Sequence, residues 1–385
     1  MRVGGQDRLR GAELNQDPFG LLDELPTDRR QRDATSNALD NAFEVAAMQL
    51  LAIPQLAYDI PGEPPSMNGG DSDTVLLLLR RVDGRFRPWQ TLPAPGGEDA
   101  EHLVIGDRHF LAVASLRTGS GPYDFSAESQ IWTWQDGRFV PFQSIPTYAA
   151  KQFRHWRIGD RDFLGLAQGI RPPGTEGPNR DSVVFEWDGS AFVEHQRIPS
   201  QWAYNWYPFS VDDTFFVAHA EHLDASVLYR WDGECLTPHQ ALLENGGRAF
   251  VDFEVDGVFH LLVAGLLEPP RLMRWDGDRF TVAQTLKGLG ARELTVLSVD
   301  GQLVVIRINF ILGTPTDPTP VLASQMYIWD AGALREAGSF ETSGGTDVTA
   351  VVDDDEVQIL VSNSLSAQVR FATDTIVYSL SVKTP

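Results

Sequence analysis

The chain of 385 residues is poor in cysteine and lysine, and it has no long apolar run. It has a single cysteine, Cys235, which excludes an intramolecular disulfide. Residues 1–14 lack the apolar stretch of a secretion signal, and no window approaches the ~18 apolar residues of a membrane span. We therefore expect a cytoplasmic protein without a membrane partner.

Positive charge is also scarce. The chain has 31 Lys and Arg against 53 Asp and Glu, which gives a formal net charge of −22. Nucleic acids select basic surfaces, so this balance argues against a nucleic-acid partner. Self-repulsion of this size favours a soluble monomer. No phosphate-binding loop, dinucleotide fingerprint or Gly-x-Ser-x-Gly motif is present, so no catalytic motif indicates an enzyme class.

What the sequence does contain is a repeat of about fifty residues. Its clearest landmark is a strand that ends in an aromatic residue, followed by an Asp-Gly turn. Asp-Gly predicts a type I′ hairpin, because both central residues of that turn need positive φ. Copies of this landmark end at Gly84, Gly137, Gly189, Gly233, Gly277 and Gly332, and a weaker seventh copy ends at Tyr378.

A second hairpin precedes each landmark, best seen in residues 103–114 around Gly106-Asp107. Each unit therefore has four strands, and four-stranded units joined in series are the blades of a β-propeller. The sequence predicts an all-β fold of seven four-stranded antiparallel blades in one domain spanning 1–385. The predicted blades are approximately 36–92, 96–146, 149–199, 203–243, 246–287, 290–340 and 344–382.

The seventh blade reaches the C-terminus before its fourth strand. Residues 19–27 have the same apolar pattern as residues 139–147, which form the fourth strand of an earlier repeat. We therefore predict that residues 19–27 close the propeller as the outer strand of blade 7. Such closure removes exposed sheet edges.

The composite repeat resembles the EAR repeat, also called EPTP, of the epilepsy-associated proteins. Three segments show the resemblance: Phe-Leu-Ala-Val-Ala (residues 110–114), Ser-x-Ile-Trp-x-Trp (129–134) and Phe-x-x-x-Gln-x-Ile-Pro-Thr (139–147). The likeness covers about residues 19–382. WD40 repeats are excluded because their Gly-His opening is missing. The resemblance implies a seven-bladed propeller used for protein–protein recognition.

Long loops are expected to lie on one face, which we call the upper face. They connect the second and third strands of four blades, at residues 57–73, 116–128, 168–181 and 309–323. Long loops on a rigid scaffold usually carry binding. The first strand of blade 4 is rich in aromatic residues and is expected to begin at this face. The candidate ligand-binding residues are Trp202, Tyr204, Asn205, Tyr123, Phe125 and Arg171.

A ring of polar side chains is expected at the start of the first strands, six residues before the Ile or Val that ends four of them and at the equivalent place in blade 7. Oxygen ligands from several blades could hold Ca²⁺. The resemblance also implies a cation in the central channel of the propeller. Alternatively, these groups bond to water and to neighbouring loop amides. No other cofactor is expected. The candidate metal ligands are Asp99, Gln152, Asn205, Glu293 and Asp347.

Two functions remain open from the sequence. The first is a non-catalytic recognition module that binds a protein or a bulky small molecule at the upper face and channel mouth. The second is a cofactor-independent or metal-assisted enzyme of specialised metabolism, of the cyclase or lyase type. In that case Asp99, Glu293 or Asp347 would act as acid or base. The fold itself supports both functions.

Overall fold

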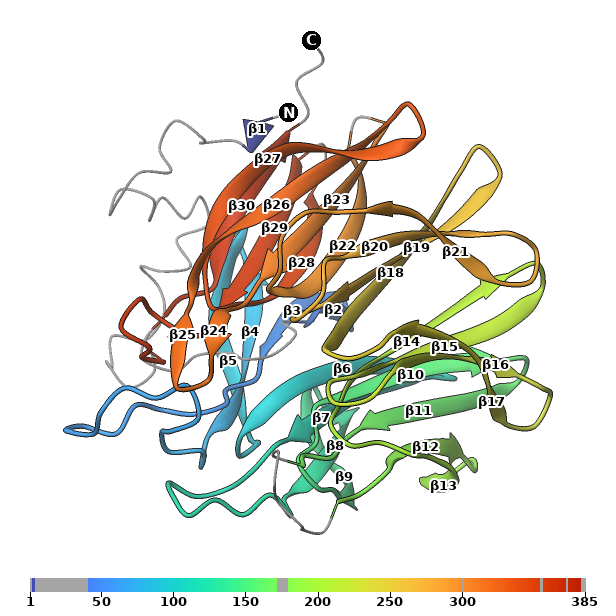
Figure 1. The fold of residues 1–385 in the computed structure, drawn as a ribbon. Coiled ribbons are helices and arrows are strands. Elements are labelled where there is room, and N and C mark those ends of the chain that lie inside the picture. The colour runs from blue at the N-terminus through green and yellow to red at the C-terminus, as the bar shows by residue number, and fades with distance from the viewer. Residues whose placement is uncertain are drawn as a thin grey trace. The chain divides into compact units, whose positions relative to one another are not determined.

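The computed structural model describes residues 2–3, 41–171, 179–299, 301–353, 356–371 and 373–381. All regular structure in these ranges is β-strand, and the strands form seven four-stranded antiparallel sheets plus one small hairpin (Figure 1). The fold is therefore the seven-bladed β-propeller that the repeat predicted. Within the described ranges no helix is long and apolar enough to cross a membrane.

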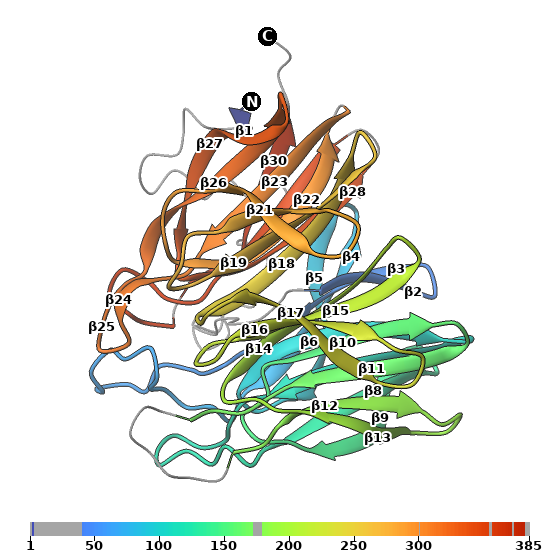
Figure 2. The same cartoon turned by 45° about the vertical axis from the view of Figure 1, so that its right-hand side comes forward.

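The described chain forms two compact units, of which one holds blades 2 to 5. Each of these blades runs in simple strand order, and neighbouring blades pack through their first strands, as β10 does with β14 (Figure 2). The strands are β6 (Gly97–Ile105), β7 (Arg108–Ser115), β8 (Glu128–Gln135), β9 (Arg138–Pro146), β10 (Gln152–Ile158), β11 (Arg161–Ala167), β12 (Ser182–Trp187), β13 (Phe192–Ile198), β14 (Ala203–Val211), β15 (Thr214–Glu221), β16 (Ser226–Trp231), β17 (Leu236–Leu243), β18 (Gly247–Val255), β19 (Val258–Gly265), β20 (Arg271–Trp275) and β21 (Phe280–Thr285).

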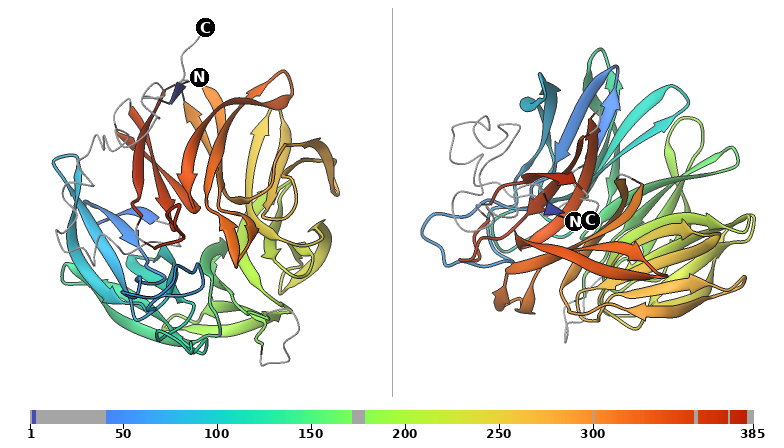
Figure 3. Two further views of the ribbon diagram at one scale, coloured as in Figure 1. Left: turned by 60° about the vertical axis from the view of Figure 1, so that its left-hand side comes forward. Right: turned by 90° about the horizontal axis from the view of Figure 1, so that it is seen from above.

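The other unit holds blades 1, 6 and 7, and blades 6 and 7 (orange and red in Figure 3) pack through β23 and β28. The long connection of blade 6 carries the extra hairpin β24–β25. The strands are β2 (Asn41–Val45), β3 (Met48–Ile53), β4 (Val75–Val82), β5 (Arg85–Pro93), β22 (Ala291–Val299), β23 (Gln302–Asn309), β24 (Leu312–Thr314), β25 (Asp317–Thr319), β26 (Val321–Asp330), β27 (Ala333–Ser343), β28 (Gly345–Asp353), β29 (Glu356–Asn363) and β30 (Ile376–Ser381).

Blade 7 takes its fourth strand from the N-terminal part of the chain. This strand is β1 (Arg2–Val3), which pairs antiparallel with β30. Residues 19–27, which we predicted for this role, lie outside the described residues.

The Asp-Gly turns are of two kinds, which corrects the prediction of one type I′ turn throughout. Asp136 and Gly137 both have positive φ (50° and 79°), as a type I′ turn requires. In Asp188-Gly189 only the glycine has a positive φ, of 99°. There the loop is longer, and the Asp188 carboxylate accepts hydrogen bonds from the Ser190 and Ala191 amides, each 2.8 Å long. The same arrangement recurs at Asp232 and Asp276.

The glutamine of the repeat joins the outer strands of neighbouring blades. The Gln196 side chain donates to the backbone oxygen of Leu236 (2.8 Å) and accepts from its amide (2.9 Å). Gln143 and Gln240 make the same two bonds to Phe192 and Phe280. These bonds satisfy backbone groups at the start of the next outer strand, which would otherwise lack strand partners.

Candidate functional site

The predicted polar ring begins with two side chains that connect neighbouring first strands. The Asp99 carboxyl in β6 accepts a 2.9 Å hydrogen bond from the amide of Phe153 in β10. One blade further, the Gln152 side-chain oxygen accepts a 2.7 Å bond from the amide of Trp206 in β14. Both pairs are 54 residues apart in the sequence, so the same bond recurs at two successive blade interfaces.

Asp99 is 1% exposed, and this burial has a clear electrostatic consequence. Desolvation, together with the nearby charge of Glu101, holds the pKa of the Asp99 carboxyl well above its usual range. Glu101 itself accepts a 3.0 Å bond from the amide of His155. Within these two strands the side chains therefore bond to neighbouring backbone amides.

The remaining members of the predicted ring are also largely buried. Asn205 is 7% exposed, and Glu293 and Asp347 are 8% and 3% exposed. Glu293 accepts a bond from the amide of the next residue, Leu294 (2.9 Å). Over the described parts of the chain, no group of three or more His, Cys, Asp or Glu is placed to hold a metal ion.

One residue earlier, in or just before the same strands, lies a different set of side chains. Lys151 pairs with Glu98 at 2.7 Å, and its ammonium lies 5.3 Å from the centroid of the Tyr204 ring. The Arg248 guanidinium lies 3.7 Å from the same centroid. Glu98, Lys151, Tyr204 and Arg248 each stand seven residues before the end of a first strand, so equivalent positions of blades 2 to 5 contact one another in series.

Trp202 and His222 extend this set in blade 4. The His222 ring lies edge-on to both aromatic rings, with centroids 5.0 Å from Trp202 and 6.0 Å from Tyr204. The Glu221 carboxylate fixes the chain here, since it accepts from the amide of Trp202 (2.6 Å) and that of Gln201 (3.1 Å). We call Glu98, Lys151, Trp202, Tyr204, His222 and Arg248 the first-strand cluster.

Buried positive charge dominates the electrostatics of the cluster. Arg248 is 2% exposed, and its guanidinium lies 3.2 Å from the Nδ1 of His222. Burial, and the charges of Arg248 and Lys151, lower the pKa of His222 to about 3. A neutral His222 ring can accept a hydrogen bond from Arg248, which an imidazolium could not. By contrast, the Trp202, Tyr204 and His222 rings are partly exposed.

The three loop residues of the predicted site lie in different surroundings. Tyr123 covers the buried Arg117, whose guanidinium lies 3.6 Å from the ring centroid. Phe125 packs near Tyr148, with ring centroids 6.5 Å apart. Arg171 is exposed and donates a 3.2 Å hydrogen bond to Gln201, the neighbour of Trp202.

Counting six residues back from each strand end missed Glu98, Lys151 and Arg248. Counting seven would have found them together with Tyr204. The sequence did carry this signal, because acidic, basic and aromatic side chains alternate at that position in successive blades. Trp206, on the other hand, is 1% exposed and packs against Trp156 and His219, so it has a structural role in the core.

The EPTP domain model matches residues 85–134, 138–188 and 191–232. Each matched segment begins in or just before the fourth strand of one blade and ends in or just after the third strand of the next. The sequence repeat is thus offset from the blade by one strand. This offset explains why the last blade needs an N-terminal strand.

Two curated relatives are similar to part of this chain. The chain is 27% identical over 186 residues to the human thrombospondin-type laminin G domain and EAR repeat-containing protein, covering 47% of this chain and 26% of that protein. It is 34% identical over 89 residues to leucine-rich repeat LGI family member 3 of Macaca fascicularis, covering 23% of this chain and 15% of the relative. The chain thus spans about a quarter or less of each relative's length.

A solved structure, that of BBS1N in complex with ARL6DN, resembles the fold with a TM-score of 0.54 at 10% identity. The match covers 91% of this chain and 93% of that one, and it bears on the fold alone. The repeat, its match to the family model and the seven blades agree. The chain is therefore a seven-bladed β-propeller in which three segments, within residues 85–232, match the EPTP domain.

Proposed function

We propose that this chain is a protein-recognition module that binds an acidic segment of a partner through the first-strand cluster. The observation that carries the proposal is the contact of the partly exposed Tyr204 ring with two cations, Lys151 and Arg248, which stand at equivalent positions of the neighbouring blades. Aromatic and arginine side chains are the residue types that most often dominate binding energy at interfaces. The EPTP matches in this chain, and the EAR repeat for which its human relative is named, support this role.

The expected charge of the partner follows from the charges around the cluster. The cluster and its neighbours contain four cations, namely Lys151, Arg248, Arg117 and the exposed Arg171. They contain two carboxylates, those of Glu98 and Glu221. Both oxygens of Glu221 already accept hydrogen bonds from residues 200–202. Within a chain of net charge −22, these four cations against two carboxylates give the first-strand cluster and its immediate neighbours a positive balance. Complementary charge gives specificity and faster association.

A selection from a random peptide library displayed on phage tests the proposal directly. The purified chain is the bait, and a second selection uses the double variant Trp202→Ala/Tyr204→Ala. We expect the wild-type bait to enrich Asp- and Glu-rich sequences that the double variant does not. As a matched control, Trp89→Ala removes a partly buried aromatic ring from β5 and should retain the enrichment. Equal enrichment by the wild type and the double variant would contradict the proposal.

A further inference from the structure

Two blade interfaces share an arrangement in which an arginine covers a tryptophan. Trp187 and Trp231 end the third strands of blades 3 and 4. The Arg108 guanidinium lies 5.4 Å from the ring centroid of Trp187, and that of Arg161 lies 5.3 Å from the centroid of Trp231. Both arginines are the first residue of the second strand in the preceding blade. Each interface therefore contains its own cation–π contact.

The next interface has the same aromatic rings without the arginine. Trp275 ends the third strand of blade 5 and packs against Phe216, with centroids 5.5 Å apart. The equivalent pairs, Phe110–Trp187 and Phe163–Trp231, are 5.4 Å and 5.2 Å apart. The first residue of the second strand is here Thr214.

No guanidinium or ammonium lies over the Trp275 ring anywhere in the described residues. The Trp275 ring therefore has the surroundings in which the two preceding interfaces place a cation, and the described residues supply none there.

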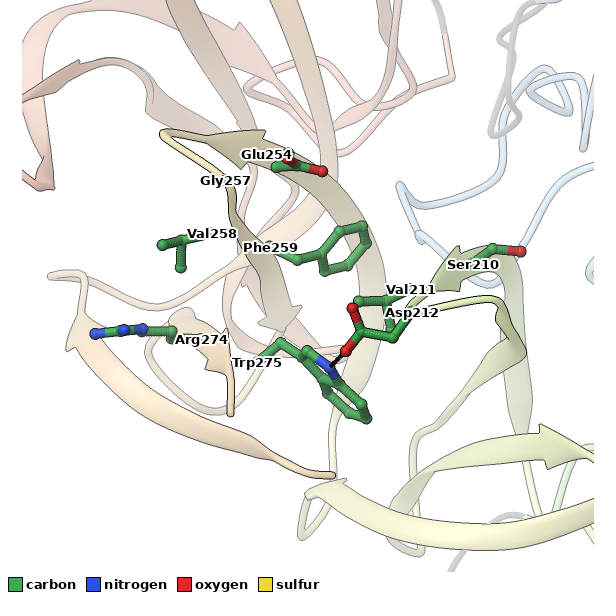
Figure 4. A pocket seen from close by; sticks show the side chains of 9 residues that line it. All are labelled: Ser210, Val211, Asp212, Glu254, Gly257, Val258, Phe259, Arg274 and Trp275. Atoms are coloured by element: carbon green, nitrogen blue, oxygen red, sulfur yellow. Dashed lines mark hydrogen bonds between the residues drawn. The ribbon is translucent and has the colours of Figure 1, made fainter. Parts of the chain in front are cut away.

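A pocket of about 420 Å³ opens beside Trp275 (Figure 4). This volume lies within the roughly 300–1,000 Å³ usual for ligand sites. Apolar surface comes from Trp275, Phe259 and Val211, and carboxylates come from Asp212 and Glu254. Arg274 also lines the pocket, but Figure 4 shows its guanidinium directed away from Trp275.

Asp212 is the second change from the pattern of the preceding blades. It stands in the turn between β14 and β15, where blades 2 and 3 have Gly106 and Gly159. Its carboxylate accepts a 2.6 Å hydrogen bond from the Trp275 indole nitrogen, drawn in Figure 4. A carboxylate has about four acceptor positions, so further donors can still bind to it. The interface that lacks the arginine has thus gained an acid beside the tryptophan.

We propose that this pocket binds the guanidinium group of an arginine side chain from a partner protein. The planar guanidinium would lie against the Trp275 ring, as Arg108 and Arg161 lie against Trp187 and Trp231. It would also donate hydrogen bonds to Asp212 and Glu254. Guanidinium stacks on aromatic faces and pairs bidentately with carboxylates better than ammonium does, so arginine is favoured over lysine. This site is separate from the first-strand cluster, and its test does not depend on that proposal.

The test is a titration of the full chain with N-acetyl-arginine methylamide, followed by NMR of the ¹⁵N-labelled protein. The indole N–H signal of Trp275, identified by its loss in Trp275→Phe, should shift and saturate. N-acetyl-citrulline methylamide has nearly the same shape without the charge and should bind at least about tenfold more weakly; the lysine analogue should also bind more weakly. No saturable shift, or equal shifts with the arginine and citrulline probes, would overturn the proposal. Equal binding of the lysine analogue would overturn the preference for guanidinium.

Two variants separate binding in the pocket from a general effect on the protein. Thr214→Arg supplies the arginine that the other two interfaces already contain, so it should weaken binding of the arginine probe at least about tenfold. Thr214→Val should leave binding unchanged. Asp212→Asn keeps a residue type that tolerates the positive φ of 47° and should weaken binding without unfolding the chain. Thermal melting checks that each variant is folded. Unchanged binding in a folded Thr214→Arg variant would contradict the assigned site.

Discussion

The carboxyl of Asp99 and the amide of Phe153 form a buried 2.9 Å hydrogen bond between the first strands of blades 2 and 3. From its place in the sequence, Asp99 is a candidate metal ligand and a candidate catalytic group. Its position gives it a partner on the backbone of the next blade. The consequences for stability can be measured.

Replacing Asp99 by alanine should destabilise the chain by about 1–3 kcal/mol, because the buried Phe153 amide loses its acceptor. Asp99→Asn retains a side-chain oxygen and carries no charge, so at pH 7 it should be at least as stable as the wild type. Urea unfolding of the three proteins makes the comparison. A loss in Asp99→Asn as large as that in Asp99→Ala would contradict this account.

The raised pKa of Asp99 also predicts a dependence on pH. Above pH ~4 the unfolded chain releases this proton while the folded chain keeps it, so the wild type loses stability as pH rises toward the folded pKa. The loss should be up to about 1.4 kcal/mol per pH unit. Asp99→Asn has no titratable carboxyl at this position, so its stability lacks this dependence on pH. The stability of the wild type relative to Asp99→Asn should therefore fall as pH rises, and a constant difference between pH 4 and 7 would be inconsistent with the pKa shift.

His222 should produce the opposite dependence. Its folded pKa is about 3, below the ordinary value of 6.5, so between these values only the unfolded chain takes up the proton. Stability should therefore fall as pH drops below 6.5, by up to about 1.4 kcal/mol per pH unit. His222→Gln cannot gain this charge and should show a shallower loss between pH 7 and 5. Equal slopes for His222→Gln and the wild type would count against a neutral His222 ring in the folded chain.

The Gln196 side chain should contribute more to the free energy of unfolding than a polar side chain at the surface usually does. Gln196→Ala leaves the amide and the carbonyl of Leu236 without their side-chain partners, and we expect a loss of about 1–3 kcal/mol in urea unfolding. Gln130 is the matched control, since its exposed bond to Ser144 joins strands within one blade. Gln130→Ala should change stability by no more than about 0.5 kcal/mol. Similar effects of the two substitutions would argue against the joining role of Gln196.

The seven blades could be predicted because strand alternation and turn residues are local properties that recur in every repeat. The two forms of the Asp-Gly turn were harder, since they differ only in how many residues follow the glycine before the next strand. The partners of Asp99 and Gln152 could not be predicted, because they are backbone amides 54 residues away. Lys151 and Arg248 were missed because a count that is off by one residue in a strand selects side chains of the opposite orientation.

The most direct test of the recognition proposal is calorimetric titration of a library-selected acidic peptide into the wild-type chain and into Tyr204→Ala. Tyr204 is the ring that both Lys151 and Arg248 approach. Loss of such a central aromatic residue typically weakens an interface by about 1.4 kcal/mol or more, which is tenfold in Kd. We predict at least that weakening in Tyr204→Ala and unchanged affinity in Trp89→Ala. Equal affinity for the wild type and a folded Tyr204→Ala would contradict the account.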